Sequence, residues 1–324
     1  MALISIIIPA YNAERSLGRT VRSVLEQTLK DIEVWIVDDG STDGTPELAD
    51  RLAIEDSRVR VLHQTNQRAY AARINALKHI TAPYFAFVDA DDTLEPHMYE
   101  RMLQFAEQHD LDVVQCEPVG QVRVREPDLY LSHEDVVRSY AIPTLIEGRV
   151  ASYVWDKIYK RHLAAYEFEA SSIFMFDDLK INLQIFNRVN RLGLLHEGLY
   201  HYDVNMGSSV RNFRRRNVDD LQEIIATRAR WASSYGVDAD DPCLSRWIVK
   251  NARNFIVSAC AARAESLGVR LENVRAILGL KEVQLSIEKL KDNRAEGLRL
   301  LRYCQTLPLP LVVLVIRLLK KLKS

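Results

Sequence analysis

Three aspartates follow directly on an apolar segment of this chain. Residues 84–88 are apolar, and Asp89, Asp91 and Asp92 come immediately after them. A run of this kind is typical of a strand buried on both faces. Because side chains two residues apart in extended backbone lie on one face, Asp89 and Asp91 can point at a single hard cation. Mg²⁺ or Mn²⁺ held by one or two carboxylates keeps coordination positions open, which substrate phosphates fill. The pattern suggests a metal-bridged diphosphate, although an acidic loop in solvent is its commoner explanation when it stands alone.

The elements that would position these aspartates alternate between strand and helix. Expected strands are 3–8, 32–37, 59–62, 84–88 and 112–116, and expected helices lie between them at 13–28, from 45, at 69–79 and at 96–109. Pro9 is expected to end the first strand, since proline is rare inside a central strand. The alternation predicts a parallel sheet with helices on both faces, whose ligands gather at the carboxyl ends of the strands. Polar loops at three of these ends, 9–12, 38–41 and 89–92, should therefore share one crevice.

Composition excludes several classes of protein. The 324 residues suffice for one large or two ordinary domains, and a net charge of −1 makes nucleic acid an unexpected partner. Four widely spaced cysteines indicate buried thiols in a reducing compartment, with neither zinc nor a disulfide framework expected. The first apolar run has the length of a strand and lacks the flanks of a signal peptide, and no run is long enough to span a membrane.

Three motifs together carry a resemblance to a known family. They read SIIIPAYNAE at 5–14, VDDGSTDGT at 37–45 and FVDADD at 87–92. In this order and at these separations they resemble the family 2 glycosyltransferases. The resemblance covers about the first 115 residues well and continues more thinly to about residue 210. It implies an α/β fold of the GT-A type, a Rossmann-like doubly wound sheet, here followed by an all-helical C-terminal region.

The resemblance implies roles for the residues that match the family's motifs. Pro9 and Tyr11 match positions that border the nucleotide base, and Asp39 matches the position that contacts the base or ribose. A fixed carboxylate can accept hydrogen bonds from an imide N–H or a sugar hydroxyl. Asp89 and Asp91 match the metal motif for Mn²⁺ or Mg²⁺, Asp91 as the direct ligand and Asp89 more often through ribose or water.

One stretch departs from the family pattern. Residues 66–74 keep Asn66 and Arg73, but a usual glycine is Arg68 and a usual asparagine is Ile74. Glycine lets a ligand approach the backbone closely, which arginine prevents. Arg68 could instead fork onto a diphosphate or the edge of the base. The alternative is a solvated arginine at the start of a helix.

The second half of the chain is expected to bind the acceptor. The segment 153–161 resembles the family's tryptophan and lysine near the acceptor, which points to Trp155 and Lys157. A tryptophan beside polar groups can hold a sugar by stacking and hydrogen bonds. The alternative is a core tryptophan and a surface lysine.

Two further carboxylates resemble the family's acidic pair. Apolar residues 173–176 precede Asp177 and Asp178 at the expected start of a helix. The resemblance makes Asp178 the catalytic base, with Asp177 in place of a glutamate. A carboxylate serves because the acceptor hydroxyl must lose its proton as it attacks the anomeric carbon. The alternative is a helix cap, where aspartate is favoured.

The remainder is expected to be helical and to form a third segment. The expected domains are 1–117 for the nucleotide sugar, 118–218 for the acceptor and 219–324 as a helical region that packs on the transferase or pairs subunits. Residues 307–324 have apolar and basic faces, which suit an interfacial helix on anionic lipid as well as a helix docked on its own protein.

The sequence therefore predicts an inverting, metal-dependent glycosyltransferase at the cytoplasmic membrane surface. It would transfer a sugar from a nucleotide diphosphate, UDP before GDP or dTDP, to a saccharide or lipid-linked saccharide in cell-envelope polysaccharide synthesis. The alternative from another class is a non-catalytic scaffold with this fold, which only the altered residues 66–74 favour.

Overall fold

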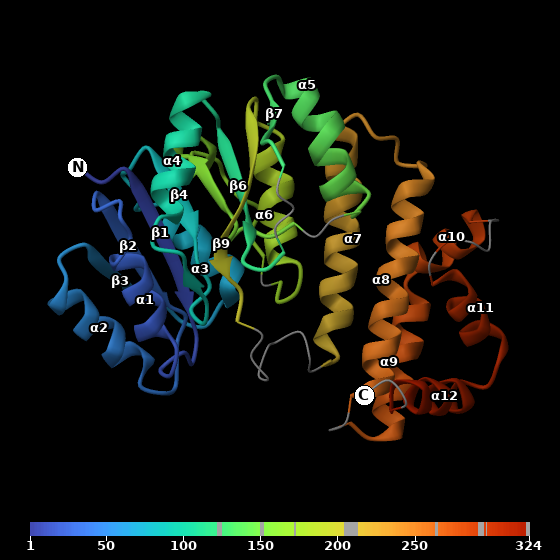
Figure 1. The fold of residues 1–324 in the computed structure, drawn as a ribbon. Helices are drawn as coiled ribbons and strands as arrows, with labels where there is room; N and C mark the ends of the chain where they lie inside the picture. Colours follow the sequence, from blue (N-terminus) through green and yellow to red (C-terminus); the bar gives the residue numbers. More distant parts are fainter. Residues whose placement is uncertain are drawn as a thin grey trace. The chain divides into compact units, whose positions relative to one another are not determined.

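The computed structural model describes residues 1–121, 125–149, 152–171, 173–203, 213–262, 265–290, 295 and 297–321. Residues 318–321 are described by their backbone alone. The chain divides into two compact units. Unit 1 comprises Met1–Ala141 and Ala151–Val204, and unit 2 comprises Ile142–Val150 and Asn205–Ser324. Figure 1 shows the sheet within the first unit and long helices within the second.

Unit 1 is built on one mixed sheet, to which nine strands of the described residues belong. The strand order is β3-β2-β1-β4-β8-β6-β9-β5, and β7 pairs with β9. The bounds are β1 Ile4–Ala10, β2 Ile32–Asp38, β3 Val59–His63, β4 Tyr84–Phe87, β5 Thr93–Leu94, β6 Val113–Pro118, β7 Asp128–Tyr130, β8 Lys157–Lys160 and β9 Leu192–His201. Strands β3, β2, β1 and β4 run parallel, whereas β8 is antiparallel to both β4 and β6.

Helices cover both faces of this sheet, which confirms the predicted α/β class. In unit 1 they are α1 Leu17–Leu25, α2 Thr45–Glu55, α3 Arg68–Leu77, α4 Met98–Gln108, α5 His133–Val136 and α6 Asp177–Phe186, with a 3₁₀ helix at Arg161–Ala164; a π-helix at Val137–Ile146 leads into unit 2. Ile6 and Ile8 of β1 pack in one core with residues of α1 and α4. On the other face, the Phe85 ring of β4 stacks on Tyr159 at 5.0 Å. Burial on both faces explains the unbroken apolar strands.

Two details of the sheet differ from the sequence-based expectations. Pro9 does not end the first strand, because β1 continues to Ala10 and pairs Pro9 with Val37. Strand β1 pairs with β4 only as far as Ile7, so the sheet loses no hydrogen bond because Pro9 lacks an N–H. The antiparallel strand β8 was not predicted, because its four residues follow no local pattern that separates them from a loop.

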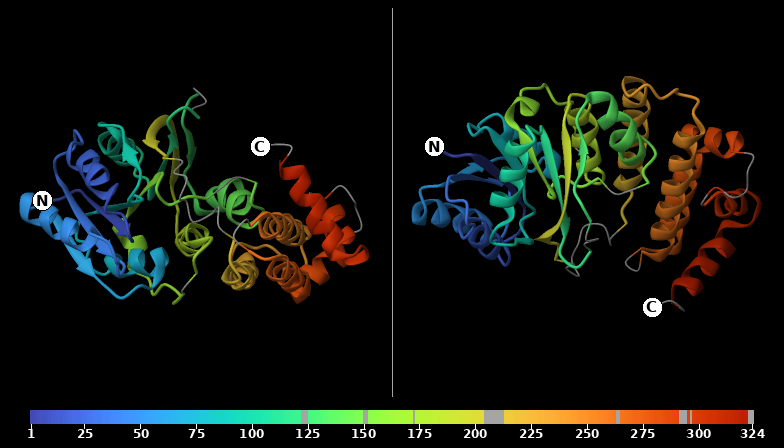
Figure 2. Two further views of the ribbon diagram at one scale, coloured as in Figure 1. Left: turned by 90° about the horizontal axis from the view of Figure 1, so that it is seen from below. Right: turned by 45° about the horizontal axis from the view of Figure 1, so that its top comes forward.

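Unit 2 contains long helices that surround α8. They are α7 Arg216–Ser234, α8 Pro242–Ala261, α9 Leu267–Gly279, α10 Lys281–Lys289, α11 Leu298–Thr306 and α12 Leu309–Lys321 (Figure 2). Helix α8 begins at proline, where no N–H is needed, and Asp241 caps it by accepting a hydrogen bond of 2.7 Å from the Cys243 N–H. Its buried face packs against α7, α9, α10, α11 and α12. None of the helices within the described residues combines the length and apolarity needed to cross a membrane.

Candidate functional site

The three polar loops lie at one edge of the sheet. Strands β2, β1 and β4 are neighbours and run parallel, so their carboxyl ends meet there. The first two loops are joined directly: Asn12 donates its backbone N–H to the Ser41 hydroxyl at 3.0 Å and accepts from the Thr42 N–H at 2.8 Å. Helix α1 holds the third loop, since Arg19 donates to the Asp91 carbonyl at 2.8 Å. The predicted shared edge is therefore present.

Arg73 of α3 joins the acidic residues of this edge. Its side chain is 4% exposed, and one guanidinium nitrogen bonds an oxygen of Asp89 at 2.6 Å. The other terminal nitrogen pairs with Asp177 and lies 3.6 Å from Asp178. Three carboxylates, one from the loop after β4 and two from the start of α6, thus share one guanidinium. The bidentate fork of arginine suits such an arrangement better than the single ammonium of lysine.

Burial and mutual repulsion alter the protonation of this cluster. Burial raises the pKa of Asp89, and Asp177 and Asp91 add to the rise, while Arg73 opposes it. Burial and the neighbouring Asp177 likewise raise the pKa of Asp178 well above its ordinary value, again against Arg73. Burial alone would lower the pKa of Arg73, but the three carboxylates reverse this and raise it. Clusters of residues with perturbed pKa values are typical of functional sites.

The acidic pair begins α6 after a left-handed residue. Phe176 has a φ of 67°, which is unfavourable for a residue with a Cβ. Its carbonyl nonetheless accepts the Lys180 N–H at 2.9 Å, so the helix starts with Asp177 and Asp178 in its first turn. The positive end of the helix dipole stabilises carboxylates in this turn. Asp177 takes the stronger contact with Arg73, which leaves Asp178 the less constrained of the two.

Asp91 has the chemistry of a metal ligand. Within the described residues its carboxylate makes neither a hydrogen bond nor an ion pair, whereas Asp92 accepts from the Tyr200 hydroxyl at 2.7 Å and from the Asp203 N–H at 2.8 Å. No group of three or more His, Cys, Asp or Glu side chains is placed to hold a metal in the part of the chain that the structure describes. Mg²⁺ and Mn²⁺ sites completed by phosphates and water need only one or two carboxylates, so the residues present fit such an ion.

Asp39 and Arg68 are linked by the backbone. The buried Asp39 carboxylate accepts the N–H groups of Gln67 and Arg68 at 2.7 and 2.8 Å, and the Gln64 amide at 2.8 Å. Arg68 has a φ of 79°, the left-handed conformation that a glycine adopts readily. Its guanidinium lies 5.8 Å from the centre of the Phe174 ring. Base or diphosphate contacts for Asp39 and Arg68 remain predictions, as do those for Pro9 and the half-exposed Tyr11.

The acceptor residues named from the sequence are buried. Trp155 is 3% exposed, and its ring stacks on Tyr153 at 4.6 Å, on Tyr200 at 4.3 Å and on Tyr202 at 5.8 Å. The fully buried Lys157 donates to the Tyr153 carbonyl at 2.7 Å and pairs with Asp156 at 2.6 Å. Tyr153 and Tyr202 are 40% and 47% exposed, so they supply the open aromatic surface of this stack. Acceptor contacts of Trp155 and Lys157 remain predictions.

The sequence-based reasoning left Arg73 without a role and gave none to Tyr153 or Tyr202 individually, although both lie in stretches that resemble the family's acceptor side. For Arg73 a signal existed, since it is one of two residues that the altered stretch 66–74 shares with the family pattern. Tyr153 lies in the segment 153–161 that the sequence pointed to, two residues before Trp155, whereas the stacking of Tyr202 on Trp155 depends on pairing between distant segments.

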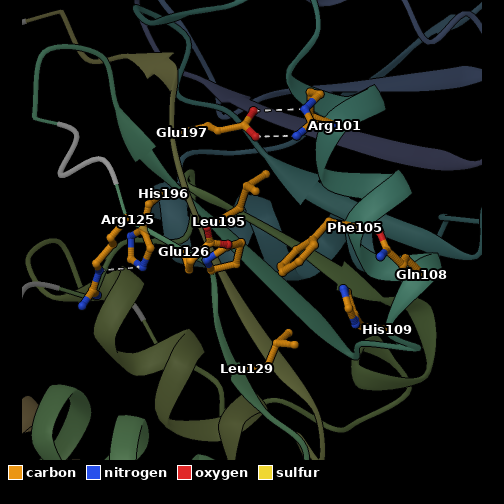
Figure 3. Close-up of a pocket in the computed structure, with 11 residues that line it drawn as sticks. Arg101, Phe105, Gln108, His109, Arg125, Glu126, Leu129, Leu195, His196 and Glu197 are labelled. Atoms are coloured by element: carbon orange, nitrogen blue, oxygen red, sulfur yellow. Dashed lines mark hydrogen bonds and ion pairs between the residues drawn. The ribbon is translucent and has the colours of Figure 1, made fainter.

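Unit 1 also contains a hollow with a different lining. Its volume is about 540 Å³, and it is bounded by residues of α4, by 125–129 and by β9 (Figure 3). Both of its arginines are already paired, Arg101 with Glu197 at 2.5 Å and Arg125 with the neighbouring Asp128 at 2.7 Å. None of the site residues predicted from the sequence lines it. The acidic edge around Arg73 is therefore the candidate site.

Comparisons with known proteins point to one family and one fold. A family model described as "Glycosyl transferase family 2" matches residues 5–171. EpsJ of Bacillus subtilis (strain 168), an uncharacterized glycosyltransferase, is 30% identical over 312 residues, which cover 88% of this chain and 86% of EpsJ. S. aureus TarS 1–349 in complex with UDP-GlcNAc has a TM-score of 0.66 and 18% identity, over 100% of this chain and 93% of TarS. The mannosyltransferase PcManGT from Pyrobaculum calidifontis, in complex with GDP-Man and Mn²⁺, has a TM-score of 0.54 and 18% identity, over 98% and 88%.

The fold is that of GT-A glycosyltransferases. The chain belongs to glycosyl transferase family 2, as its three motifs predicted.

Proposed function

We propose that this glycosyltransferase is inverting and metal-dependent, and that it takes a sugar from a nucleotide diphosphate donor to a hydroxyl of a saccharide or lipid-linked saccharide. One observation supports this most: a single buried guanidinium gathers Asp89 of the metal motif and the acidic pair Asp177 and Asp178 at the carboxyl edge of the parallel sheet. A donor bound at Asp89 and Asp91 would place its anomeric carbon beside the acidic pair.

In this mechanism Asp178 accepts the proton of the attacking hydroxyl. Its raised pKa makes the ionised carboxylate a stronger proton acceptor than an exposed aspartate. Arg73 and Asp177 hold it in place, since both belong to the same ion-pair cluster. Attack from the side opposite the leaving phosphate, in one displacement, inverts the anomeric centre.

Asp91, with Asp89, would hold the Mn²⁺ or Mg²⁺. When bound, the ion would neutralise negative charge that develops on the leaving diphosphate. Asp39 and the loop 64–68 would border the nucleoside, with Tyr11 as an open ring at the same edge. UDP-sugars are the first donors to test and GDP-sugars the second, because the more similar structure, TarS, holds UDP-GlcNAc and the less similar one, PcManGT, holds GDP-Man.

The experiment measures melting temperature with a panel of UDP-, GDP- and dTDP-sugars, each with and without Mn²⁺. A ligand that binds the folded state alone raises the melting temperature. We expect a rise that requires both nucleotide and metal, lost in Asp91→Ala. Asp31→Ala is the matched control, because this exposed aspartate precedes β2 at the opposite edge of the sheet. A chain that responds to no nucleotide, or equally in both variants, contradicts the proposal.

We also propose that α12 attaches the protein to the cytoplasmic face of the membrane, where cell-envelope acceptors are lipid-linked. Val312, Val313 and Ile316 are buried, while Leu311, Leu314 and Val315 remain about half exposed. Such an exposed apolar stripe suits an interfacial helix. Replacing the three exposed residues by serine should reduce co-sedimentation with phosphatidylglycerol vesicles, whereas Leu285→Ser, at an exposed leucine of α10, should not. Equal pelleting of the two variants would remove the membrane role.

A further inference from the structure

Two exposed tyrosines of unit 1 lie over a buried tryptophan. The rings of Tyr153 and Tyr202 make angles of 21° and 17° with the ring of Trp155, so all three are nearly parallel. Trp155 itself is buried, and Tyr200 stacks on it as well. The aromatic surface that a ligand can reach therefore belongs to the two tyrosines.

Tyr202 lies beside the loop that carries the metal motif. The next residue, Asp203, donates its N–H to Asp92 at 2.8 Å, and Tyr200 donates its hydroxyl to the same carboxylate at 2.7 Å. The Asp89 N–H donates to the Tyr200 hydroxyl at 3.3 Å. The backbone is thus bonded to this loop on both sides of Tyr202.

Tyr153 is tied to the helix that carries the proposed base. Its carbonyl accepts hydrogen bonds from the Asn182 amide at 2.9 Å and from Lys157 at 2.7 Å. Asn182 follows Asp178 by four residues in α6, so the two side chains project from the same face of that helix. Because Asn182 and Lys157 are fully buried, the backbone of Tyr153 is held in a fixed position relative to Asp178.

The electrostatics of both phenols agree with this placement. Burial raises the pKa of Tyr153, and nearby carboxylates, Asp178 among them, add to the rise. Burial likewise raises the pKa of Tyr202, and here the carboxylates that add to it include Asp91. Such effects fall off with distance, so one ring lies near the proposed base and the other near the proposed metal ligand.

An open aromatic surface beside polar groups suits a sugar ring. A pyranose presents C–H groups on its face, which pack on an aromatic ring, and hydroxyls at its edge, which need hydrogen-bond partners. Within the residues that the structure describes, the hydroxyls of Tyr153 and Tyr202 make no hydrogen bond, so both can bond to such a ligand. A lipid chain would cover these hydroxyls without replacing their bonds to water, which is unfavourable.

We propose that Tyr153 and Tyr202 form the platform on which the sugar that carries the attacking hydroxyl stacks, and that this sugar is a pyranose held by its C–H face. Asn182 and Lys157 are positioning residues, since they fix the platform relative to the base without touching the sugar. Trp155 supports the platform from behind. This assignment rests on the proposed function, because it places the acceptor beside a donor site and a base.

Saturation-transfer NMR on the full chain tests the platform. The probes are methyl pyranosides of glucose, galactose, mannose and N-acetylglucosamine, each added with UDP and Mn²⁺. Saturation of the aromatic protons of the protein should reach one face of at least one pyranoside more than the other. Tyr153→Leu and Tyr202→Leu keep an apolar surface but lose the ring, so each should raise the dissociation constant of that pyranoside about fivefold.

Two further variants separate the ring from its hydroxyl and from tyrosines in general. Tyr153→Phe keeps the ring, so it should bind more weakly but preserve the preference for one sugar face. Tyr303→Leu, at an exposed tyrosine of α11, is the matched control and should bind like the wild type. Leucine variants of Tyr153 and Tyr202 that bind like the wild type would show that any apolar surface suffices, as for a lipid chain, and would overturn the proposal.

Asn182→Leu tests the positioning role. This change keeps the shape of the side chain but removes its hydrogen bond to the Tyr153 carbonyl. We expect the preference for one sugar face to be lost while UDP and Mn²⁺ still raise the melting temperature. A lower melting temperature with an unchanged face preference would instead show that Asn182 is merely structural.

The response to UDP and Mn²⁺ separates the two possible failures. A wild type that responds to the nucleotide and the metal but receives no pyranoside saturation overturns the platform and leaves the proposed donor site intact. A wild type whose melting temperature responds to no nucleotide contradicts the proposed function, and the platform fails with it.

Discussion

Replacing Arg73 tests the physical core of the candidate site. In Arg73→Met a side chain of similar length remains, but Asp89, Asp177 and Asp178 lose the positive charge that they share. Removing one partner of a buried ion pair typically costs about 3–5 kcal/mol. Because the three carboxylates stay 20–29% exposed, water screens part of their repulsion. We therefore expect a loss of about 3 kcal/mol in unfolding free energy at pH 8.

The loss should depend on pH with a definite sign. Burial already raises the pKa of Asp89 and Asp178 against the opposing effect of Arg73, so without Arg73 the native values rise further. Between the unfolded value near 4 and the raised native value, the native state binds more protons than the unfolded state. Stability therefore falls as pH rises through this window. The deficit of Arg73→Met should be smaller at pH 5 than at pH 8.

Urea unfolding followed by circular dichroism at both pH values measures this. Arg19→Met is the matched control, because Arg19 pairs with Asp203 at 2.8 Å on the surface of the same unit and should cost under about 1 kcal/mol. Arg73→Lys keeps the charge but loses the fork, so its deficit should be intermediate. The reasoning is refuted if Arg73→Met costs no more than Arg19→Met, or if its deficit is the same at pH 5 and pH 8.

Three further predictions concern single residues of the same unit. Asp178→Asn should lower nucleotide release from the donor by at least about 100-fold while calorimetry still detects nucleotide and Mn²⁺ binding, because only the proton acceptor is lost; retained turnover would exclude Asp178 as the base. Arg68→Gly should be more stable than Arg68→Ala by about 1 kcal/mol in urea unfolding, because a left-handed φ strains every residue except glycine; equal stabilities would contradict this. The hydrogen bond to Asp38 raises the pKa of the half-exposed His63, so His63→Gln should lower the free energy of unfolding by up to about 0.5 kcal/mol at pH 6 and by nothing above the raised native pKa. A constant difference from pH 6 to 9 would show that the ion pair with Asp38 does not contribute to stability.

The sheet was predictable because its parallel strands carry their signal locally. Residues such as Ile6, Ile7 and Ile8 are buried on both faces, and this leaves an unbroken apolar run in the sequence. Strand β8 has no such signal. It lies between β4 and β6, and its residues pair with partners at least 42 positions earlier, Lys157 with Gln115 being the nearest pair. Lys157 is buried there with Asp156 and the Tyr153 carbonyl as its partners. Long-range pairing of this kind is absent from any local window of the sequence.

The types of residue in the candidate site were predictable from the sequence, but the contacts that join them were not. The motifs placed Asp89 and Asp178 at one edge, but the residue that joins them lies on α3, where a lone arginine in an amphipathic helix indicates solvent exposure more often than burial. Only the packing of α3 against β1 and α6 brings the guanidinium of Arg73 to the carboxylates.

The altered stretch 66–74 can be explained by the same contacts. Asp39 binds the backbone N–H groups of Gln67 and Arg68, which every residue other than proline supplies, so this network does not require the family's glycine. The conformation favours glycine without demanding it, because a left-handed residue costs only about 1–2 kcal/mol. Arg73, five residues into the helix that Arg68 begins, must by contrast supply a charge and a fork that no backbone group can replace. The stretch thus keeps Arg73, whose ion pairs join the candidate site, and places Arg68 where the backbone alone makes the contacts; nothing in these contacts explains Ile74. The case for a non-catalytic scaffold loses the support of Arg68.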